Sequence, residues 1–396
     1  MLRFLTAGES HGPALTTIVE GMPAGVPVTE EAINTQLARR QVGFGRGGRM
    51  VIERDVARVL SGIRFGRTLG SPIALLIENR DWPNWTVRMQ QFGTPDDPVA
   101  AVTTPRPGHA DLAGMVKYRT SDLRDILERA SARETTMRVA AGAIARALLT
   151  ALDITVFSHV LAIGPVTASP ELSDLLALQA AAEASDLRCA DAVAAAAMRE
   201  QIRAAQEAGD TLGGIVQVIV TGLPVGIGSH VHYDRKLDGR LAGALMSIPA
   251  IKGVEVGVGF AAARLTGAQM HDALYPAPDA ITRHTNHAGG LEGGISNGEP
   301  LVLQVAMKPI PTLTRPLPSL DVATGAAVQA HAERSDVCAV PAAGVVAEAM
   351  VALVLASSML EQYSADTLEG LRASILDSQQ NLQALFTKQG PGSIVP

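Results

Sequence analysis

A serine–histidine pair, Ser10-His11, lies in the glycine-bounded segment Gly8–Gly12. Imidazole titrates near neutral pH, so a histidine presented by a tight loop can donate or accept a proton. A hydrolase nucleophile elbow would need a helix directly after the motif, and we expect none here. The alternative is a plain turn whose polar side chains face water.

A second histidine, His109, lies in the proline-stiffened segment Pro105–Asp111, which also carries Arg106. An aspartate near a histidine can hold its tautomer or raise its pKa, so Asp111 could serve His109. Asp111 could instead cap the helix that follows, which would leave His109 without an explanation.

Arginine and glycine are concentrated in residues 39–49, which contain four of each. Guanidinium groups match phosphate and carboxylate, and glycines let backbone N–H groups approach an anion. Arg39 and Arg40 could simply favour the end of a helix, but this does not explain Arg46 and Arg49 in the glycine-rich loop. The segment therefore predicts a site for a ligand with several negative charges.

Two more segments offer cations beside polar groups. Glu128–Thr135 places arginines at an expected helix N-terminus, where a phosphate could bind, although Ser131 and Glu134 also fit a capping box. Lys308–Thr312 and Arg334–Cys338 supply a cation, a hydroxyl and a carboxylate. From spacing alone, a simple salt bridge between the arginine and aspartate of the latter segment is the stronger interpretation.

Composition limits the class of protein. The 396 residues are 47% hydrophobic and 18% charged, which predicts a large buried core. A net charge of −6 argues against nucleic-acid binding, and Cys189 and Cys338 alone indicate a reducing cytoplasm. No signal peptide is evident. The apolar segment Val340–Leu360 contains Glu348, so we expect a buried helix with Pro341 in its first turn rather than a membrane span.

The chemistry-bearing loops must be positioned by a mixture of strands and helices. A helix is expected to begin at Thr29 and to end before Gly43, and another to run from Ser131 to about Leu152. Residues 79–108 are expected to form a long functional loop, and residues 168–210 an Ala-rich helical region. Strands are expected at residues 2–6, 15–19, 50–53, 57–61, 73–77, 213–221, 253–260 and 301–307. One α+β domain over residues 1–396 fits this pattern best.

Taken together, the residues predict arginine-based binding of a small polyanionic substrate and a phosphate-bearing cofactor, with histidines that transfer protons. The phosphate-binding loop and Rossmann patterns are absent. A metal site is not expected, although His284 and His287 have metal-like spacing and His230 and His232 would share a face of a strand. These patterns do not identify the substrate or the cofactor.

The sequence closely resembles the chorismate synthase family, because several long motifs occur in the family's order over nearly the whole chain. The matching segments are Gly8–Gly12, Gly43–Met50, Arg106–Asp111, Glu128–Thr135, Met246–Gly253, Gly293–Gly298 and Arg334–Cys338. The resemblance implies a cytoplasmic homotetramer with helices sandwiched between antiparallel β-sheets. It also implies reduced FMN as cofactor and an anti 1,4-elimination of phosphate from 5-enolpyruvylshikimate 3-phosphate, the last step of the shikimate pathway.

The resemblance also assigns roles to individual residues. His11 matches the histidine that protonates the departing phosphate, His109 the one that interacts with the reduced flavin ring, and Asp336, with Ser10 nearby, the aspartate that assists proton removal. Residues that match flavin contacts are Arg129, Ala130, Ser131, Pro249, Ala250, Gly294, Lys308, Pro309, Ile310, Pro311, Thr312 and Arg334. Residues that match substrate or NADPH anion contacts are Arg40, Arg46, Arg49 and Arg106.

Departures from the family pattern are small. Phe44 stands where a tyrosine is frequent, and Arg119 stands where a glycine is common. Long insertions of flavin-reducing members are absent, so we expect a separate flavin reductase to supply reduced FMN, with NADPH acting only indirectly. Two alternatives stay open at this point: an NADPH-flavin oxidoreductase, and an anion- or RNA-binding module that uses the Arg-Gly loop.

Overall fold

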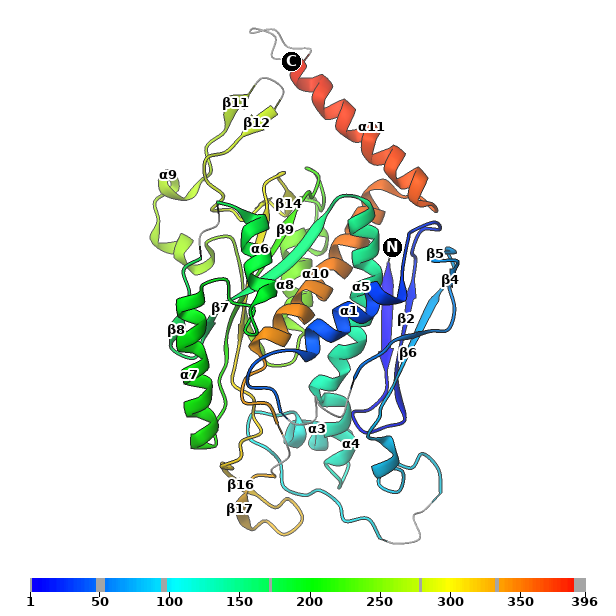
Figure 1. Ribbon diagram of the computed structural model, residues 1–396, viewed down its shortest axis with the longest axis vertical. Helices are drawn as coiled ribbons and strands as arrows, with labels where there is room; N and C mark the ends of the chain where they lie inside the picture. The colour runs from blue at the N-terminus through cyan, green and yellow to red at the C-terminus, as the bar shows by residue number, and fades with distance from the viewer. Residues whose placement is uncertain are drawn as a thin grey trace.

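The computed structural model describes residues 2–47, 54–93, 98–170, 173–277, 280–331 and 335–387 (Figure 1). Arg49, Arg334 and the strand expected at residues 50–53 lie outside these ranges. The described chain is a mixture of helices and antiparallel sheets, so the predicted α+β class is confirmed.

The first sheet contains four antiparallel strands in the order β1-β2-β6-β3. Their bounds are Arg3–Ala7, Ala14–Glu20, Ile73–Glu78 and Arg58–Val59. Leu15 lies opposite Ile77, and both are buried, as the alternating apolar pattern of these strands requires. The sheet presents the loop between β1 and β2, which carries Ser10 and His11.

The second sheet contains five antiparallel strands in the order β10-β15-β9-β7-β8. Their bounds are Ile251–Val256, Leu301–Met307, Gly214–Thr221, Thr155–Ile163 and Val166–Thr167. The strand expected at residues 253–260 ends at Val256. Gly257 and Gly259 have φ values of +60° and +54°, and this left-handed backbone breaks the extended chain.

Three long helices lie between these sheets in Figure 1: α1 (Glu30–Gln41), α5 (Thr135–Ala151) and α10 (Val340–Tyr363). Helix α5 packs on β2, α10 packs on β7 and β9, and α5 and α10 pack on each other. At their crossing, a Cβ added to Gly142 would lie 2.4 Å from the Cβ of Ala349. A glycine is therefore required for the close approach of the two helices.

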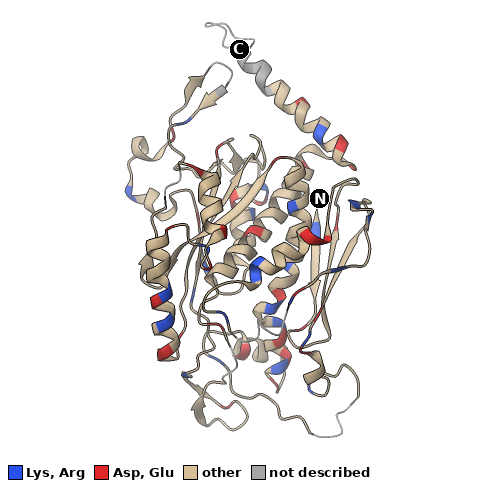
Figure 2. Ribbon diagram, in the orientation of Figure 1, with Lys and Arg blue, Asp and Glu red and all other residues tan. Residues whose placement is uncertain are grey.

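The remaining elements are shorter. The helices are α3 (Asp111–Tyr118), α4 (Arg124–Ala130), α6 (Leu175–Ala184), α7 (Ala192–Ala208), α8 (Leu237–Met246), α9 (Gly267–Met270) and α11 (Leu368–Thr387), with 3₁₀ helices η1 (Trp82–Asn84), η2 (Ala132–Glu134), η3 (Tyr233–Arg235) and η4 (Gly259–Arg264). The strands are β4 (Ile63–Arg64), β5 (Arg67–Thr68), β11 (Tyr275–Ala277), β12 (Ala280–Thr282), β13 (Leu291–Glu292), β14 (Ile295–Ser296), β16 (Pro318–Leu320) and β17 (Ala327–Gln329). Figure 2 shows both signs of charge side by side on α7, as expected of a solvent-facing helix.

The expected Ala-rich helical region forms two helices, α6 and α7, with Ser185 after the end of the first and Asp191 as the N-cap of the second. Two other local expectations are corrected. His230 and His232 lie in irregular chain, not on a strand. Ser131 does not form a capping box with Glu134: it accepts a hydrogen bond from the N–H of Arg133 and opens η2, and α5 begins only afterwards.

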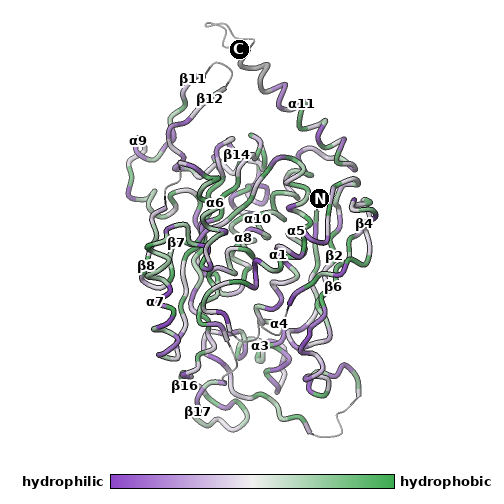
Figure 3. Tube along the Cα trace, viewed as in Figure 1, coloured by the Kyte–Doolittle hydropathy of each residue, from purple (hydrophilic) through white to green (hydrophobic). Residues whose placement is uncertain are grey.

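Helix α10 is the most apolar long helix among the described residues (Figure 3). It is long and apolar enough to cross a membrane, but 89% of its most apolar window is buried in the protein. Pro341 lies in its first turn, as predicted. A carboxylate, that of Glu348, lies within this buried window, and it requires partners.

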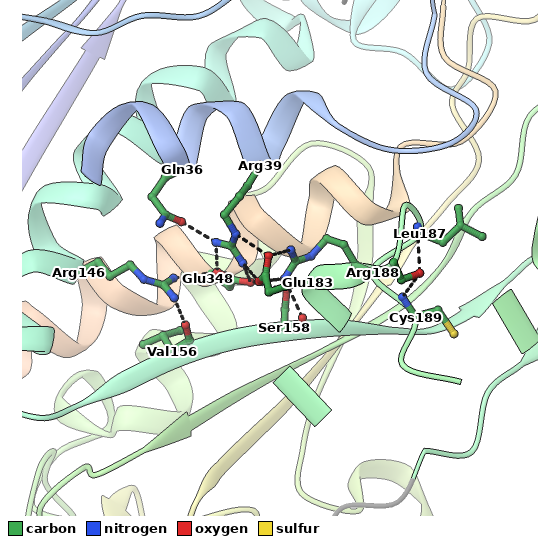
Figure 4. A network of polar contacts seen from close by, with 11 residues as sticks. Gln36, Arg39, Arg146, Val156, Ser158, Glu183, Leu187, Arg188, Cys189 and Glu348 are labelled. Atoms are coloured by element: carbon green, nitrogen blue, oxygen red, sulfur yellow. Dashed lines mark hydrogen bonds and ion pairs between the residues drawn. The ribbon is translucent and has the colours of Figure 1, made fainter. Parts of the chain in front are cut away.

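Those partners surround Glu348 completely (Figure 4). Its carboxylate accepts hydrogen bonds from Arg39 at 2.7 and 3.0 Å, Arg146 at 2.8 Å, Arg188 at 3.0 Å and Ser158 at 2.7 Å. Burial alone would raise the pKa of Glu348, but the three guanidinium groups outweigh it and lower this pKa to about 2. The network ties α1, α5 and β7 to α10.

Candidate active site

A cavity of about 430 Å³ lies where loops from both sheets meet the ends of the central helices. Its walls come from the β1–β2 loop, the end of α1, the segment before α3, the start of α5, the turn after α8, the segment after β15 and the start of α10. The predicted site residues that line it are Ser10, His11, Arg40, Arg46, Arg106, His109, Ala130, Ser131, Pro249, Ala250, Lys308, Ile310, Pro311, Thr312 and Asp336.

Other predicted residues lie elsewhere. Arg129 is adjacent to the cavity but turns away from it and donates to the backbone oxygens of Thr6 and Gly8. Pro309 does not line the cavity. Gly294 lies in the turn between β13 and β14, where its carbonyl accepts a hydrogen bond from the N–H of Leu237. Arg49 and Arg334 lie outside the described residues.

His11 is held by one carboxylate. Its Nδ1 lies 2.9 and 3.1 Å from the two carboxylate oxygens of Glu128, and its backbone N–H donates to the same group at 2.8 Å. The ring also stacks on Trp85, with centroids 3.8 Å apart. Glu128 is buried, which by itself raises its pKa, but its contacts with His11 and Arg124 have the larger effect and lower this pKa.

His109 is held in a similar way. Its Nδ1 lies 2.5 Å from Asp111, so the expectation that Asp111 orients this histidine is confirmed. The capping alternative is wrong: Asp111 is the first residue of α3, and its carboxylate accepts from the N–H and guanidinium of Arg106 instead. Burial favours a raised pKa for Asp111, but the bonds from His109 and Arg106 hold this pKa well below its usual range. Arg106 also donates to Thr312 at 3.2 Å.

Arg40 lies deeper, beside Asp55 and Arg133. Its Nε donates to Thr135 at 3.0 Å and its Nη2 to the carbonyl of Ala132 at 2.8 Å. Its Nη1 is buried without a hydrogen-bond partner and lies 3.7 Å from Asp55, which is already paired with Arg133 at 2.5 Å. Burial, and to a smaller extent the neighbouring guanidinium groups, lower the pKa of Arg40. An anion in the cavity would therefore stabilise this cation.

Asp336 also lines the cavity. It pairs with Arg46 at 2.8 Å and accepts from the N–H of Gly47 at 2.6 Å. Nearby, Lys308 donates to the carbonyl of Gly108 at 2.5 Å. Burial, helped by the charge of Lys252, lowers the pKa of Lys308.

The structure adds residues that sequence reasoning did not place at the site. Arg133, within the segment Glu128–Thr135, lines the cavity and pairs with Asp55. Trp85 lies within residues 79–108, which were expected to form a long functional loop, and its ring stacks on His11. Its indole N–H donates a hydrogen bond to Asp81, four residues earlier in the chain. This spacing was the only feature of the sequence that could have indicated where the Trp85 ring lies.

The balance of charge defines the ligand class. Arg40, Arg46, Arg106, Arg133 and Lys308 line the cavity, whereas Asp336 is its only lining carboxylate among the described residues. No group of three potential metal ligands comes together in the described part of the chain. The fold and cavity thus define an enzyme site suited to a small polyanion, with two histidines each held by a carboxylate.

Comparison with known proteins identifies the family. The profile of the chorismate synthase family matches residues 2–360. A chorismate synthase from Moorella thermoacetica is 58% identical over 391 residues, 97% of this chain and 100% of the relative, and one from Desulforamulus reducens is 57% identical over 382 residues, 96% and 99%. A crystal structure of chorismate synthase superimposes with a TM-score of 0.78 at 42% identity, covering 97% of this chain and 98% of the other.

The chain therefore belongs to the chorismate synthase family. The alternatives of a flavin oxidoreductase and an RNA-binding module find no support in these comparisons.

Proposed function

We propose that the protein converts 5-enolpyruvylshikimate 3-phosphate to chorismate and phosphate by anti 1,4-elimination. The observation that carries the proposal is the cavity of a family member with five cations and two oriented histidines on its wall. The substrate has one phosphate and two carboxylates, and guanidinium groups bind such anions best. We assign Arg40, Arg46 and Arg106 to these anions, with Arg49 assigned on resemblance alone.

We also propose that the cavity binds reduced FMN. Ile248, Pro249, Ala342 and Val346 supply an apolar wall suited to a planar ring. The buried Nη1 of Arg40, without a hydrogen-bond partner, supports a second anionic or carbonyl-bearing ligand. Bound reduced flavin would supply electron density as the C–O bond breaks. The residues that would hold it lie in Ala130–Ser131, Pro249–Ala250 and Lys308–Thr312, with Arg129, Gly294 and Arg334 proposed from resemblance.

The chain's own residues handle the protons. In our proposal, His11 gives a proton to the departing phosphate and becomes neutral, and solvent later restores that proton. Asp336 assists removal of the ring proton, supported by Ser10, which bonds Ser131 at 3.1 Å across the cavity wall. His109, oriented by Asp111, would contact the reduced flavin ring. The ring proton that is removed balances the proton that the phosphate gains, so the elimination yields chorismate and hydrogen phosphate with no net proton and no net change of oxidation state.

Several wider features belong to the same proposal. We infer one catalytic domain over residues 1–396, with the two sheets and central helices forming a β-α-β sandwich. We also infer a cytoplasmic homotetramer that depends on an external flavin reductase, with NADPH used only by that reductase. These features are supported by family membership, and the chain offers no recognisable nicotinamide motif.

The decisive experiment is anaerobic. The protein is mixed with 5-enolpyruvylshikimate 3-phosphate and chemically reduced FMN, and phosphate release and chorismate absorbance are followed. Product that requires reduced flavin supports the proposal; folded, flavin-bound protein without product contradicts it. Rapid FMN reduction by NADPH and the pure protein would contradict the need for an external reductase.

A further inference from the structure

Glu128 contacts the His11 loop through both its backbone and its side chain. Its backbone carbonyl accepts from the N–H of Ser10 at 3.1 Å, and its carboxylate accepts from both the backbone and the ring of His11. The Glu128 side chain is 1% exposed and that of His11 is 11% exposed. Water is therefore largely excluded from between the carboxylate and the His11 ring. Charge interactions are strong in such surroundings.

Two further groups complete the surroundings of His11. Arg124, one turn earlier on α4, pairs with Glu128 at 3.0 Å, and its guanidinium lies 5.1 Å from the Trp85 ring centroid. Trp85 in turn covers one face of the His11 imidazole. Asn79 anchors the chain before Trp85 to the His11 loop through the carbonyls of Glu9 and Gly12. His11, Glu128, Arg124 and Trp85 thus form a closed set of contacts.

We propose that Glu128 is the positioning residue for His11: it fixes the ring through Nδ1, leaves Nε2 for the ligand, and stabilises the imidazolium, while Trp85 shields the ring from solvent. The contacts with His11 and, to a smaller extent, with Arg124 keep Glu128 ionised, so the carboxylate acts as an acceptor for the Nδ1 proton. This arrangement follows the general rule that a carboxylate behind a histidine sets its tautomer and orientation. The inference rests on the proposed function in one respect only, namely that His11 donates a proton during the reaction.

The charged groups that act on His11 come from several elements. They are Glu128 and Arg124 on α4, Glu9 on its own loop, Arg88 beside Trp85, and across the cavity Arg46, Arg106, Arg133, Lys308 and Asp336. The cavity cations disfavour the imidazolium, and Glu128 is the one carboxylate in direct contact with the ring among the described residues. Removal of its charge therefore takes away the closest stabilisation of a protonated ring.

Trp85 provides a readout that needs no turnover. A protonated imidazole in contact with an indole quenches its fluorescence, and Trp82→Phe leaves Trp85 as the sole tryptophan of the chain. In this background, the ligand-free protein is titrated with acid and base while indole emission is followed. His11→Asn should abolish the transition, which identifies the titrating group; a transition that persists in this variant overturns the assignment.

Glu128→Gln keeps the shape and the acceptor oxygen for the His11 N–H but removes the charge. We expect the midpoint of the fluorescence transition to fall by about one pH unit or more. Asp125→Asn is the matched control, because Asp125 is an exposed carboxylate on the same helix that bonds only Thr120 among the contacts described. Equal midpoints in the two variants would overturn the proposal, since a purely structural role for Glu128 predicts no such difference.

A second variant covers the case in which Glu128→Gln does not fold. In Arg124→Met, the Glu128 carboxylate keeps its contact with His11 but loses the competing guanidinium. The midpoint of the fluorescence transition is therefore expected to rise, and an unchanged midpoint counts against the proposal. In turnover assays, Glu128→Gln should lower kcat most at high pH, with a small change in KM. Absence of chorismate formation by the unmodified protein would refute the proposed function but leave the fluorescence test of Glu128 valid.

Discussion

Arg46 and Asp336, from opposite ends of the chain, form an ion pair of 2.8 Å on the cavity wall. One is proposed to bind substrate anions and the other to assist proton removal. Without a ligand, each neutralises the other. An incoming phosphate or carboxylate must therefore compete with Asp336 for Arg46, and release of Asp336 accompanies binding.

This competition predicts opposite effects on binding and turnover in Asp336→Asn. Removal of the carboxylate should tighten inorganic phosphate binding by about threefold, because phosphate no longer competes with Asp336 for Arg46. Turnover should fall by roughly a hundredfold or more, because a proton-transfer group is lost. Isothermal titration with phosphate and single-turnover chorismate formation measure the two effects. Weaker phosphate binding would contradict this account of the pair.

Arg40→Met tests whether the buried guanidinium serves a ligand. Asp55 keeps Arg133, and the carbonyl of Ala132 keeps the hydroxyl of Thr135 at 2.6 Å, so the substitution leaves no buried partner unpaired. We expect the melting temperature without ligand to change little. The rise in melting temperature that phosphate gives the unmodified protein should be largely lost. Arg199→Met, on the exposed surface of α7, is the control and should keep that rise.

Glu348→Gln should lower the free energy of unfolding by about 3 kcal/mol or more at neutral pH, because three guanidinium groups lose a buried anionic partner. The folded state depresses the pKa of Glu348 from 4.5 to about 2. Its stabilisation is therefore complete above about pH 4.5 and lost as the pH falls toward 2. Urea unfolding across this range should show the two proteins converging. Glu183→Gln, at the half-exposed edge of the network, should cost less.

Arg119→Gly should stabilise the protein by up to about 1 kcal/mol. Arg119 ends α3 with φ at +56°, a left-handed conformation that is unfavourable for a residue with a Cβ. Glycine removes this strain but adds freedom to the unfolded chain, which limits the gain. Equilibrium unfolding in urea measures the change. Arg119→Ala retains the Cβ and should show no gain; equal gains in both variants would exclude backbone strain as the cause.

Regular periodicity made the main elements predictable. Thr29 capped α1 as expected, since its side chain accepts from the N–H of Ala32, and the apolar run from Val340 formed a buried helix around Glu348. The end of β10 was not predicted, because the two glycines after it act through positive φ values, which composition does not reveal.

At the site, sequence reasoning found the residue types but not most of their partners. The pairing of His109 with Asp111 was predictable because the two residues are only two positions apart in the chain. The contacts of His11 with Glu128, and of Arg40 with Asp55, join segments far apart in the chain and depend on how the first sheet meets α4 and α5. Only tertiary packing determines such pairs.

The position of α10 in the sequence has a consequence for biogenesis. This helix packs on α1, α5, α8 and both β7 and β9, yet it begins only at Val340. During translation, the first sheet can pack on α5 early, but the inner face of the second sheet must wait for α10. Packing of the second sheet can therefore be completed only late in synthesis, and its apolar strands stay uncovered until then.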